Sequence, residues 1–491
     1  MDKPRTIVTT DPELDDLNSM LRFLLYANEV DIAGLVYASS QFHCAGDPDA
    51  GVPPHRWPAP GDRLHIDEAV DAYAAVHHTL TVHADGYPTP DALRAVIAEG
   101  NVKVTGEYAT DTPGSDLIRA ALLDDDPRRL YVQVWGGPAT LASALRSIET
   151  EFSGTDAWDA IARKVSDKLF ITAFWKQDAT FDDYIRPHWP EVEFRDVATT
   201  TWGYMTRRVL LPDDLALVSE EWTRDHISAM GPMGAAYRVW GDGKFMAPGD
   251  TEDYFGLQGH SADELRAQGY RVWIDPLPAG GFISEGDSSA FALLVDNGLR
   301  AHLHPTWGGW GGRQTRSDDD PHLWTNHLRM PGIPGADETP VPASALDRGP
   351  DGAPRPDYAT ARWWRYIQAD FAARLRWTVT PQYAEANHHP VVTVDGDLDR
   401  TAAAGERVEV VAAASDPDGD ALSARWWVYR EAGTYPGEVG LESSWGASGL
   451  RCALSVPADA EPGQTIHLLL EVSDAGAPQL TRWQRVVVTV G

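Results

Sequence analysis

The chain has little cysteine, few basic residues for its acidic content, and no long apolar run. Only Cys44 and Cys452 occur among 491 residues, in what read as different domains, so no disulfide framework is present. Lysine and arginine number 41 against 73 aspartates and glutamates, a net charge of −32. Nucleic acids and anionic membranes bind surfaces of the opposite sign, so neither is expected as a partner.

The length of the chain and its hydropathy set further limits. At 491 residues it predicts two or three domains. No apolar segment is long enough to cross a bilayer, and a first strand predicted to begin at Thr6 leaves no room for a signal peptide. We therefore expect a cytoplasmic protein as the sequence is written, and a trimmed secreted protein would read the same way.

Tryptophan is plentiful, with nineteen residues. Aromatic faces stack on sugar rings, which makes a carbohydrate a candidate ligand. Tryptophan is also common in cores and interfaces, and its count alone favours that ordinary use.

The most informative stretch runs from Thr6 to Asp16. Residues 6–10 are all β-branched, which predicts a strand buried in a parallel sheet. From Leu17 the apolar residues recur at helical spacing. Asp11 therefore lies where a strand ends and Asp16 where a helix begins, and open α/β sheets bind ligands at such junctions.

Four acidic residues fall within six positions here, namely Asp11, Glu13, Asp15 and Asp16. They repel one another unless a cation or hydrogen-bond donors hold them, and oxygen ligands of this kind suit Ca²⁺ before Mg²⁺. The alternative is that Asp15 and Asp16 cap the helix and favour its dipole. Capping leaves Asp11 unexplained, so we favour a metal site.

This stretch resembles the Asp-x-Asp-Pro-Gly-x-Asp-Asp motif of nucleoside hydrolases, with Thr9 in place of the leading aspartate and Glu13 in place of the glycine. With those departures it is similar to the nucleoside-hydrolase-like, cellulose-binding-protein family of the Sde182 type. The resemblance implies that Asp11 and Asp16 bind Ca²⁺ and that Asp11 also activates a water. It further implies that Asp15 contacts a sugar hydroxyl.

Two later junctions supply the rest of the calcium shell that the resemblance implies. A strand over residues 130–135 runs into a glycine turn, where the carbonyl of Ala139 takes the place of a backbone ligand. Asp287 precedes an apolar helix at the place of the family's His-Asp pair, and would complete the shell. Gly286 stands at the histidine position, so a histidine acid is missing. A tight turn at the glycines and an N-cap at Asp287 are the alternatives.

The resemblance also implies contacts with the substrate. Ser40 stands where nucleoside hydrolases have a sugar-binding asparagine, and Gln177, Asp178 and Asp182 follow the strand at residues 168–174. An acidic loop in so acidic a protein is equally typical of solvated surface. For the proton to the leaving group, His43, Asp178 and Asp182 are the possible donors.

A run of glycine, tryptophan and arginine at residues 305–313 is a further candidate. Glycine lets the backbone approach a ligand closely, while Trp307, Trp310 and Arg313 offer stacking faces and a fork of donors. We expect these three on the substrate side. The alternative is a glycine-rich loop that packs its tryptophans against the core.

The fold class predicted for residues 1–384 is α/β, with a nucleoside-hydrolase-like, mostly parallel sheet flanked by helices. Segments 66–80, 90–99 and 362–377 read as helices, 31–37 and 271–276 as strands, and 199–269 as an irregular insertion near the cleft. Residues 385–491 read as short strands between turns, which predicts an immunoglobulin-like β-sandwich. The Asp416–Asp420 turn, which recurs in immunoglobulin-like and cadherin-like modules, could bind Ca²⁺ or carry no ligand.

Two functions from different classes remain open. One is a calcium-assisted hydrolase of a glycosidic bond in a saccharide, glycoside or N-ribosyl substrate, with Asp11 as the base. The other is a catalytically weak carbohydrate- or cellulose-binding protein on the same scaffold. A structural or adhesive use of the C-terminal domain is a third possibility. The expected partner is a small molecule or an oligosaccharide, and a homo-oligomer is possible.

Overall fold

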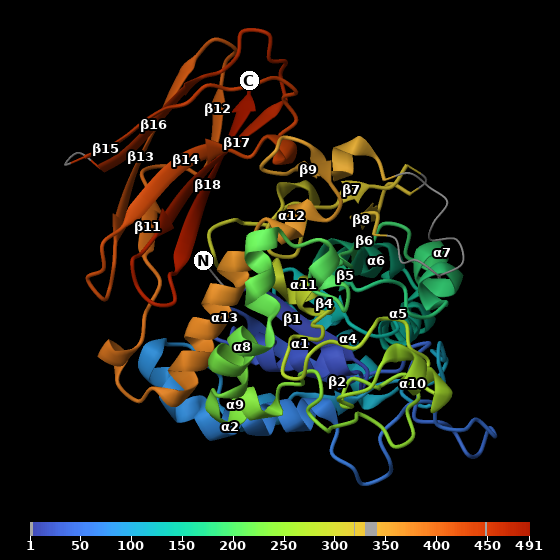
Figure 1. Ribbon diagram of the computed structural model, residues 1–491. Coiled ribbons are helices and arrows are strands. Elements are labelled where there is room, and N and C mark those ends of the chain that lie inside the picture. Colours follow the sequence, from blue (N-terminus) through green and yellow to red (C-terminus); the bar gives the residue numbers. More distant parts are fainter. Residues whose placement is uncertain (1–2, 319, 329–340, 447–448) are drawn as a thin grey trace.

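The computed structural model describes residues 3–318, 320–328, 341–446 and 449–491, folded into a large α/β part and a C-terminal β-sandwich (Figure 1). The α/β part is built on one eight-stranded sheet. Its strands are β1 (Arg5–Thr10), β2 (Asp31–Tyr37), β3 (Ile97–Glu99), β4 (Leu130–Val134), β5 (Leu169–Ala173), β6 (Glu193–Asp196), β7 (Thr315–Arg316) and β8 (Leu323–Thr325).

The order of the strands creates a crevice beside β1. The sheet runs β3-β2-β1-β4-β5-β6-β8-β7, and every neighbouring pair is parallel except β7 with β8. The chain moves outward from β1 to β3, then crosses back to β4 on the other side of β1. Ligand sites of open α/β sheets lie at the carboxyl ends of strands where the order reverses in this way. Asp11 and Gly136 follow β1 and β4 at that point.

Helices cover both faces of the sheet. Strand residues such as Ile7 and Val8 point to opposite faces, and each belongs to a separate buried cluster. One layer packs α1, α2, α11 and α13 against the sheet, and the other packs α4, α5 and α6. The helices of the α/β part are α1 (Leu14–Leu24), α2 (His65–His83), α3 (Pro90–Arg94), α4 (Pro113–Leu123), α5 (Ala139–Phe152), α6 (Trp158–Lys168), α7 (Arg186–His188), α8 (Glu220–Thr223), α9 (Gly231–Ala236), α10 (Ala262–Ala267), α11 (Ser288–Ala292), α12 (Tyr358–Ala361) and α13 (Trp364–Val379).

Two local predictions were wrong. Residues 90–99 do not form one helix, because α3 ends at Arg94 and residues 97–99 become strand β3, which pairs with β2. Residues 271–276 form no strand, and the backbone of Ile274 bonds to the hydroxyl of Tyr254 instead of to a neighbouring strand. In both segments tertiary contacts decide the backbone conformation, which a local pattern cannot show.

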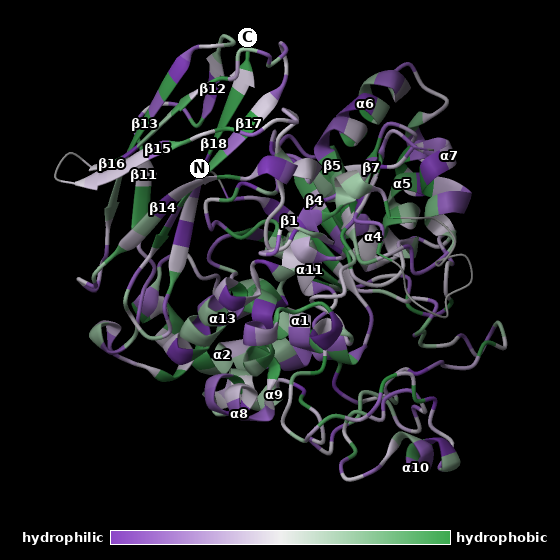
Figure 2. Ribbon diagram, turned by 45° about the horizontal axis from the view of Figure 1, so that its top comes forward, coloured by the Kyte–Doolittle hydropathy of each residue, from purple (hydrophilic) through white to green (hydrophobic). Residues whose placement is uncertain are grey.

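The insertion predicted over residues 199–269 is largely irregular, as expected, and the irregular chain continues to residue 283. Figure 2 shows its part around α10 standing off from the helix layers. Phe255, Leu265 and Ile283 give it a small buried cluster of its own, which also includes Leu14 at the start of α1. The insertion is thereby fixed next to the carboxyl end of β1.

The C-terminal part is a sandwich of two four-stranded sheets, ordered β11-β13-β16-β15 and β12-β18-β17-β14. All pairs are antiparallel except β12 with β18. The strands are β11 (Val391–Val394), β12 (Asp399–Ala402), β13 (Arg407–Ser415), β14 (Ser423–Val428), β15 (Glu442–Gly446), β16 (Gly449–Ser455), β17 (Thr465–Ser473) and β18 (Thr481–Val490). A two-stranded hairpin, β9 (Asp347–Arg348) with β10 (Pro354–Arg355), lies in the chain before α12. The predicted fold class is thus confirmed for both parts.

The sandwich is docked firmly on the α/β part. Trp483 of β18 is fully buried, and its ring meets Trp310, Trp363 and Tyr366 edge-on. Its backbone N–H donates to the carbonyl of Asn297 at 2.9 Å. Both apolar area and backbone pairing therefore hold the two parts together.

Within the described residues, no helix is long and apolar enough to cross a membrane.

Candidate cation and substrate site

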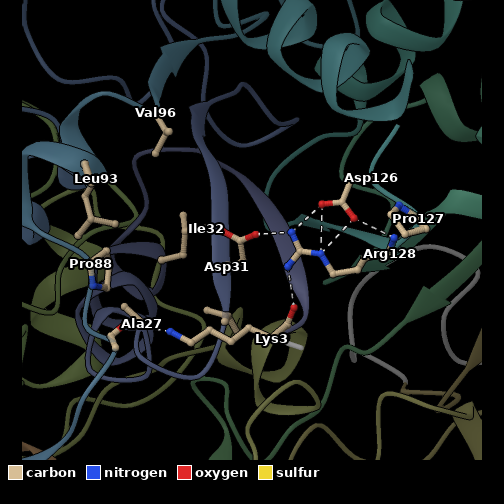
Figure 3. Close-up of a pocket in the computed structure, with 13 residues that line it drawn as sticks. Lys3, Ala27, Asp31, Ile32, Pro88, Leu93, Val96, Asp126, Pro127 and Arg128 are labelled. Carbon is tan, nitrogen blue, oxygen red and sulfur yellow. Dashed lines mark hydrogen bonds and ion pairs between the residues drawn. The ribbon is translucent and has the colours of Figure 1, made fainter. Parts of the chain in front are cut away.

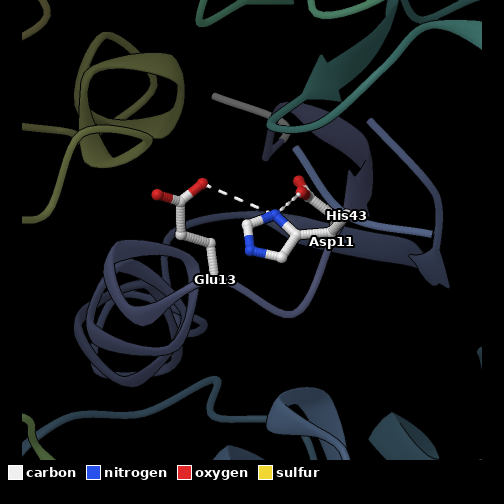
Figure 4. Close-up of side chains that lie close together, drawn as sticks. All are labelled: Asp11, Glu13 and His43. Carbon is white, nitrogen blue, oxygen red and sulfur yellow. Dashed lines mark hydrogen bonds and ion pairs between the residues drawn. The ribbon is translucent and has the colours of Figure 1, made fainter. Parts of the chain in front are cut away.

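Asp11 lies fully buried at the carboxyl end of β1 (Figure 4). Its Oδ2 accepts hydrogen bonds from Ser40 Oγ and His43 Nδ1, both at 2.7 Å. Its Oδ1 has no hydrogen-bond partner among the described residues. A Cβ on Gly136 would lie 2.5 Å from that oxygen, so the glycine after β4 leaves room for the carboxylate. One oxygen of Asp11 is thus held and the other is free to bind a ligand.

Glu13 and Asp15 share a tyrosine that comes from the insertion. The Tyr204 hydroxyl lies 3.2 Å from Glu13 Oε1 and 3.2 Å from Asp15 Oδ1, and Ser284 Oγ donates to Asp15 Oδ2 at 3.0 Å. Burial, followed by the charge of Asp15, raises the pKa of Glu13 to about 7. Burial also raises the pKa of Asp15. A positive charge placed beside these carboxylates would favour their ionised form.

Asp16 is held from the opposite side by Thr10. The threonine hydroxyl donates to Asp16 Oδ1, so His65 Nε2, 2.9 Å from the same hydroxyl, must be a donor to it. Burial lowers the pKa of His65 to about 3, which keeps this imidazole neutral. A neutral relay from His65 through Thr10 therefore orients Asp16 without supplying a charge.

Asp287 begins α11 and converges on the same group. Burial, then the charge of Asp287, raises the pKa of Asp16 well above its usual range. Burial, then the charges of Asp15 and Asp11, does the same for the pKa of Asp287. Asp287, far along the chain from Asp11, Asp15 and Asp16, thus lies near enough for these carboxylates to disfavour one another's ionisation. The structure brings together Asp11, Asp15, Asp16 and Asp287.

The residues present fit a cation. Asp11, Glu13 and His43 offer ligand atoms within 4.8 Å of one another, and so do Glu13, Asp15 and Asp16. Asp287 Oδ1 is buried and, like Asp11 Oδ1, has no hydrogen-bond partner in the described part of the chain. Buried carboxylate oxygens without donors are costly unless a positive charge pairs with them. Asp287 belongs to neither 4.8 Å group, so its place in one shell with Asp11 stays a prediction.

Gly286 marks the clearest departure in the site. A Cβ at this position would lie 2.8 Å from Asp15 Oδ2 and 3.2 Å from two ring atoms of Phe174. No larger side chain fits there unless the phenyl ring moves. The space that the family's histidine would use is therefore taken by an aromatic ring and a carboxylate.

Ala139 and Asp178 have local structural partners. Ala139 is the first residue of α5, and its N–H donates to Asp178 Oδ2 at 3.1 Å. Carbonyls of a first helical turn point along the helix toward the amides that follow, which here means away from the helix start. Asp178 Oδ1 accepts from the N–H and the hydroxyl of Thr180. Asp178 thus caps α5, and the expected role of the Ala139 carbonyl as a ligand gains no support from this geometry.

The other predicted substrate residues differ in their placement. Ser40 is at the site, but its hydroxyl donates to Asp11 and accepts the N–H groups of Phe42 and His43. Gln177 is buried, with Nε2 bonded to two carbonyls and Oε1 without a partner among the described residues. Asp182 is exposed and pairs with Lys176 at 2.7 Å. Of these three, Ser40 alone touches the carboxylates.

Trp307 and Trp310 pack against the β-sandwich, and Arg313 pairs with Asp347 of β9 instead of with the site carboxylates. Trp307 packs edge-on against His467, and Trp310 does so against Trp483. Arg313 Nε donates to the buried carboxylate of Asp347 at 2.8 Å. These contacts favour the alternative interpretation, in which the loop packs its tryptophans into an interface.

Sequence reasoning missed the residues that reach the carboxylates from far along the chain. Tyr204 comes from an irregular region without a motif, so no local signal points to it, whereas Ser284 lies in the segment singled out for Asp287 but was given no role. His65 begins the long helix α2, and its spacing from other histidines matches no metal-binding motif that would single it out. The hydroxyl of Thr10 was interpreted only as a β-branched strand position.

A wide groove of about 860 Å³ lies at the other end of the sheet (Figure 3). It is lined at the amino ends of β1, β2 and β4 by residues that include Lys3, Asp31 and Arg128. Arg128 Nη2 bonds to Asp31 at 2.7 Å and to Asp126 at 2.6 Å, and Lys3 Nζ donates to the carbonyl of Gly86. In this groove Arg128 is paired with two carboxylates and Lys3 with a backbone carbonyl. We therefore place the candidate site at the buried carboxylates and not in this groove.

Two family models match the chain. One describes the nucleoside hydrolase-like domain of cellulose-binding Sde182 and matches residues 5–314, and the other describes the C-terminal domain of cellulose-binding protein Sde0182 and matches residues 407–490. No curated protein matches.

One solved structure shows likeness of fold over the whole chain. A nucleoside hydrolase-related hypothetical protein from Saccharophagus degradans, described as associated with carbohydrate metabolism, is 24% identical over 100% of both chains, with a TM-score of 0.70. A plant nucleoside hydrolase is 12% identical over 77% of this chain and 99% of its own, with a TM-score of 0.32. Cadherin domains of protocadherin gamma B7 are 16% identical over 19% of this chain and 23% of their own, with a TM-score of 0.14.

Proposed function

This chain belongs to the family of cellulose-binding Sde182 proteins with a nucleoside hydrolase-like domain, and from that premise we propose that it is a calcium-assisted hydrolase of glycosidic bonds. Its substrate would be a saccharide, a glycoside or an N-ribosyl compound. The observation that carries the proposal is the pair of buried, unpartnered oxygens, Asp11 Oδ1 and Asp287 Oδ1, within one group of carboxylates.

The proposed ligands are Asp11, Asp16 and Asp287, and the Ala139 carbonyl stays a weaker candidate. Ca²⁺ at this place would supply a hard positive charge that polarises a water and binds sugar hydroxyls. Ser40 and His43 hold Asp11 Oδ2, so Asp11 Oδ1 would face the cation and its water, and the Asp11 carboxylate would accept the proton of that water as it attacks. Asp15 would stabilise the oxocarbenium character that develops at the anomeric carbon.

A catalytically weak carbohydrate-binding protein is the second candidate. The closed space at Gly286 favours it, because an acid for the leaving group has no room there. Asp178 is engaged as a helix cap and Asp182 lies in solvent beside Lys176, which leaves His43 as the remaining predicted donor at the carboxylates.

One experiment distinguishes the hydrolase from the carbohydrate-binding protein. The full-length protein is incubated with nucleosides, aryl furanosides and plant polysaccharides, with and without chelator, and both release of product and binding are measured. The hydrolase predicts product that the chelator abolishes and that Asp11→Asn reduces by 10²-fold or more, about the loss expected for a general base.

Asp182→Asn is the matched control, because it makes the same change at an exposed carboxylate and should leave turnover intact. Binding that survives chelator and Asp11→Asn, without product from any of the substrates, would establish the binding protein instead.

A further inference from the structure

A buried arginine lies beneath the carboxylates and joins the two segments that carry them. Arg22 is on α1, the helix that begins with Asp15 and Asp16, and Glu285 precedes Asp287 by two residues. Arg22 Nη2 donates to Glu285 Oε1 at 2.9 Å, and Arg22 Nε donates to Oε2 of the same carboxylate. The two side chains are 1% and 0% exposed.

The remaining groups of this ion pair are also satisfied. Glu285 accepts from the hydroxyls of Tyr237 and Ser288. Arg22 Nη2 also donates to Gln368 Oε1 at 2.8 Å, and its guanidinium lies 3.6 Å from the centre of the Phe371 ring. Bidentate, desolvated pairs of this kind have a fixed geometry and are costly to break.

The Arg22–Glu285 pair joins two segments whose carboxylates repel one another. Asp287 belongs to the segment at residues 284–288, which lies against the start of α1: Ser284 Oγ donates to Asp15 Oδ2 at 3.0 Å, and a Cβ on Gly286 would lie 2.8 Å from the same oxygen. Like charges would drive this segment away from α1 in the absence of a restraint. Ser284 and Ser288 also bond to α1, through their hydroxyls to Asp15 and Ser19 and through the Ser284 carbonyl to Asn18 Nδ2, but these are single contacts without the two parallel bonds of the ion pair.

We propose that Arg22 and Glu285 are positioning residues that fix Asp287 against α1 and so complete the cation site. The inference rests on the proposed function for the cation itself. Partners that orient metal ligands without touching the metal commonly change affinity by about 10- to 100-fold when they are removed. A loss of that size is expected here, although neither side chain would contact the ion.

The test measures Ca²⁺ affinity by titration calorimetry on the full-length, chelator-treated protein, together with urea unfolding. Glu285→Gln removes one charge, and the double variant Arg22→Met with Glu285→Met removes both and refills the space. Replacing a buried ion pair by apolar residues commonly restores stability, whereas breaking it does not. We therefore expect both variants to bind Ca²⁺ about tenfold or more weakly, even where the double variant is as stable as the wild type.

Asp347→Asn is the matched control, because this fully buried carboxylate also accepts from an arginine, Arg313, but at the domain interface. It should lose stability and keep its Ca²⁺ affinity. If neither Glu285 variant folds, Arg22→Lys keeps the buried charge, loses the fork of donors, and is expected to show the same weakening.

A folded double variant, or Arg22→Lys, that binds Ca²⁺ as the wild type does would overturn the inference and leave the proposed function standing. A wild-type protein that takes up no Ca²⁺ would overturn the cation-assisted function together with the inference. The two failures are therefore distinguishable.

Discussion

Some residues of the candidate site can be located from the sequence alone, and others cannot. Asp11, Asp15 and Asp16 follow one strand within six positions, so local spacing places them at one sheet edge. The close fit of Gly286 between Asp15 and Phe174 is invisible in the sequence, because one neighbour comes from helix α1 and the other from the loop after β5. Where a glycine is required by what lies beside it, only the packed structure shows the reason.

Gly286→Ala tests that fit. The new Cβ would meet Asp15 Oδ2 at 2.8 Å and the Phe174 ring at 3.2 Å, so we expect a loss of about 1 to 3 kcal/mol in the free energy of unfolding. Urea unfolding measures it. Gly154→Ala is the control, since nothing lies within 4 Å of a Cβ there, and it should leave stability unchanged. Equal stability of the two variants would show that the contact is relaxed at no cost.

At the scale of elements, the loop after β5 supports the start of α5. Asp178 was predicted to contact a sugar, yet its carboxylate bonds the first amide of the helix and the backbone of Thr180. Sequence reasoning could place the residue after a buried strand, but not decide between cap and ligand. That choice depends on whether another element's free N–H lies within reach, which is a tertiary fact.

Asp178→Ala should therefore act on stability. We expect a loss of about 1 kcal/mol, the usual cost of removing a cap, with no change in carbohydrate binding per folded molecule. Thermal unfolding and equilibrium binding measure the two effects. Asp182→Ala, at an exposed carboxylate four residues on, should change neither. Weaker sugar binding by a stable Asp178→Ala protein would restore the substrate role.

At the scale of the whole molecule, the interface between the two parts is built from buried charge as well as tryptophan. Arg485 Nη1 donates to His467 Nδ1 at 3.0 Å, so that nitrogen must be unprotonated. Arg485 Nη2 also donates to the carbonyl of Gly308, which belongs to the α/β part. Burial, then the charge of Arg485, lowers the pKa of His467 to about 2.

This arrangement predicts a loss of stability in acid. His467 has its ordinary pKa of about 6.5 when unfolded, so its contribution is complete above that pH and falls as the pH drops below it. At pH 4.5 the loss from this one group should approach about 3 kcal/mol. Urea unfolding of wild type and His467→Gln at pH 7.5 and 4.5 measures it, and the variant should lose less.

His78→Gln, a change at an exposed histidine, is the control and should follow the wild type at both pH values. Parallel loss of stability by the wild type and His467→Gln would show that protonation at the interface is accommodated.

The sequence by itself determined the class of fold, the family and the place where acidic side chains cluster. These depend on local periodicity and on a motif within one strand-to-helix junction. The tertiary structure decided what surrounds that place, namely the hydroxyl of Tyr204 and the ring of Phe174. It also decided that Trp307 and Trp310 pack against the sandwich and that Arg313 pairs with Asp347. Such contacts join residues far apart in the chain, and they are fixed by packing between elements, which no pattern along one segment encodes.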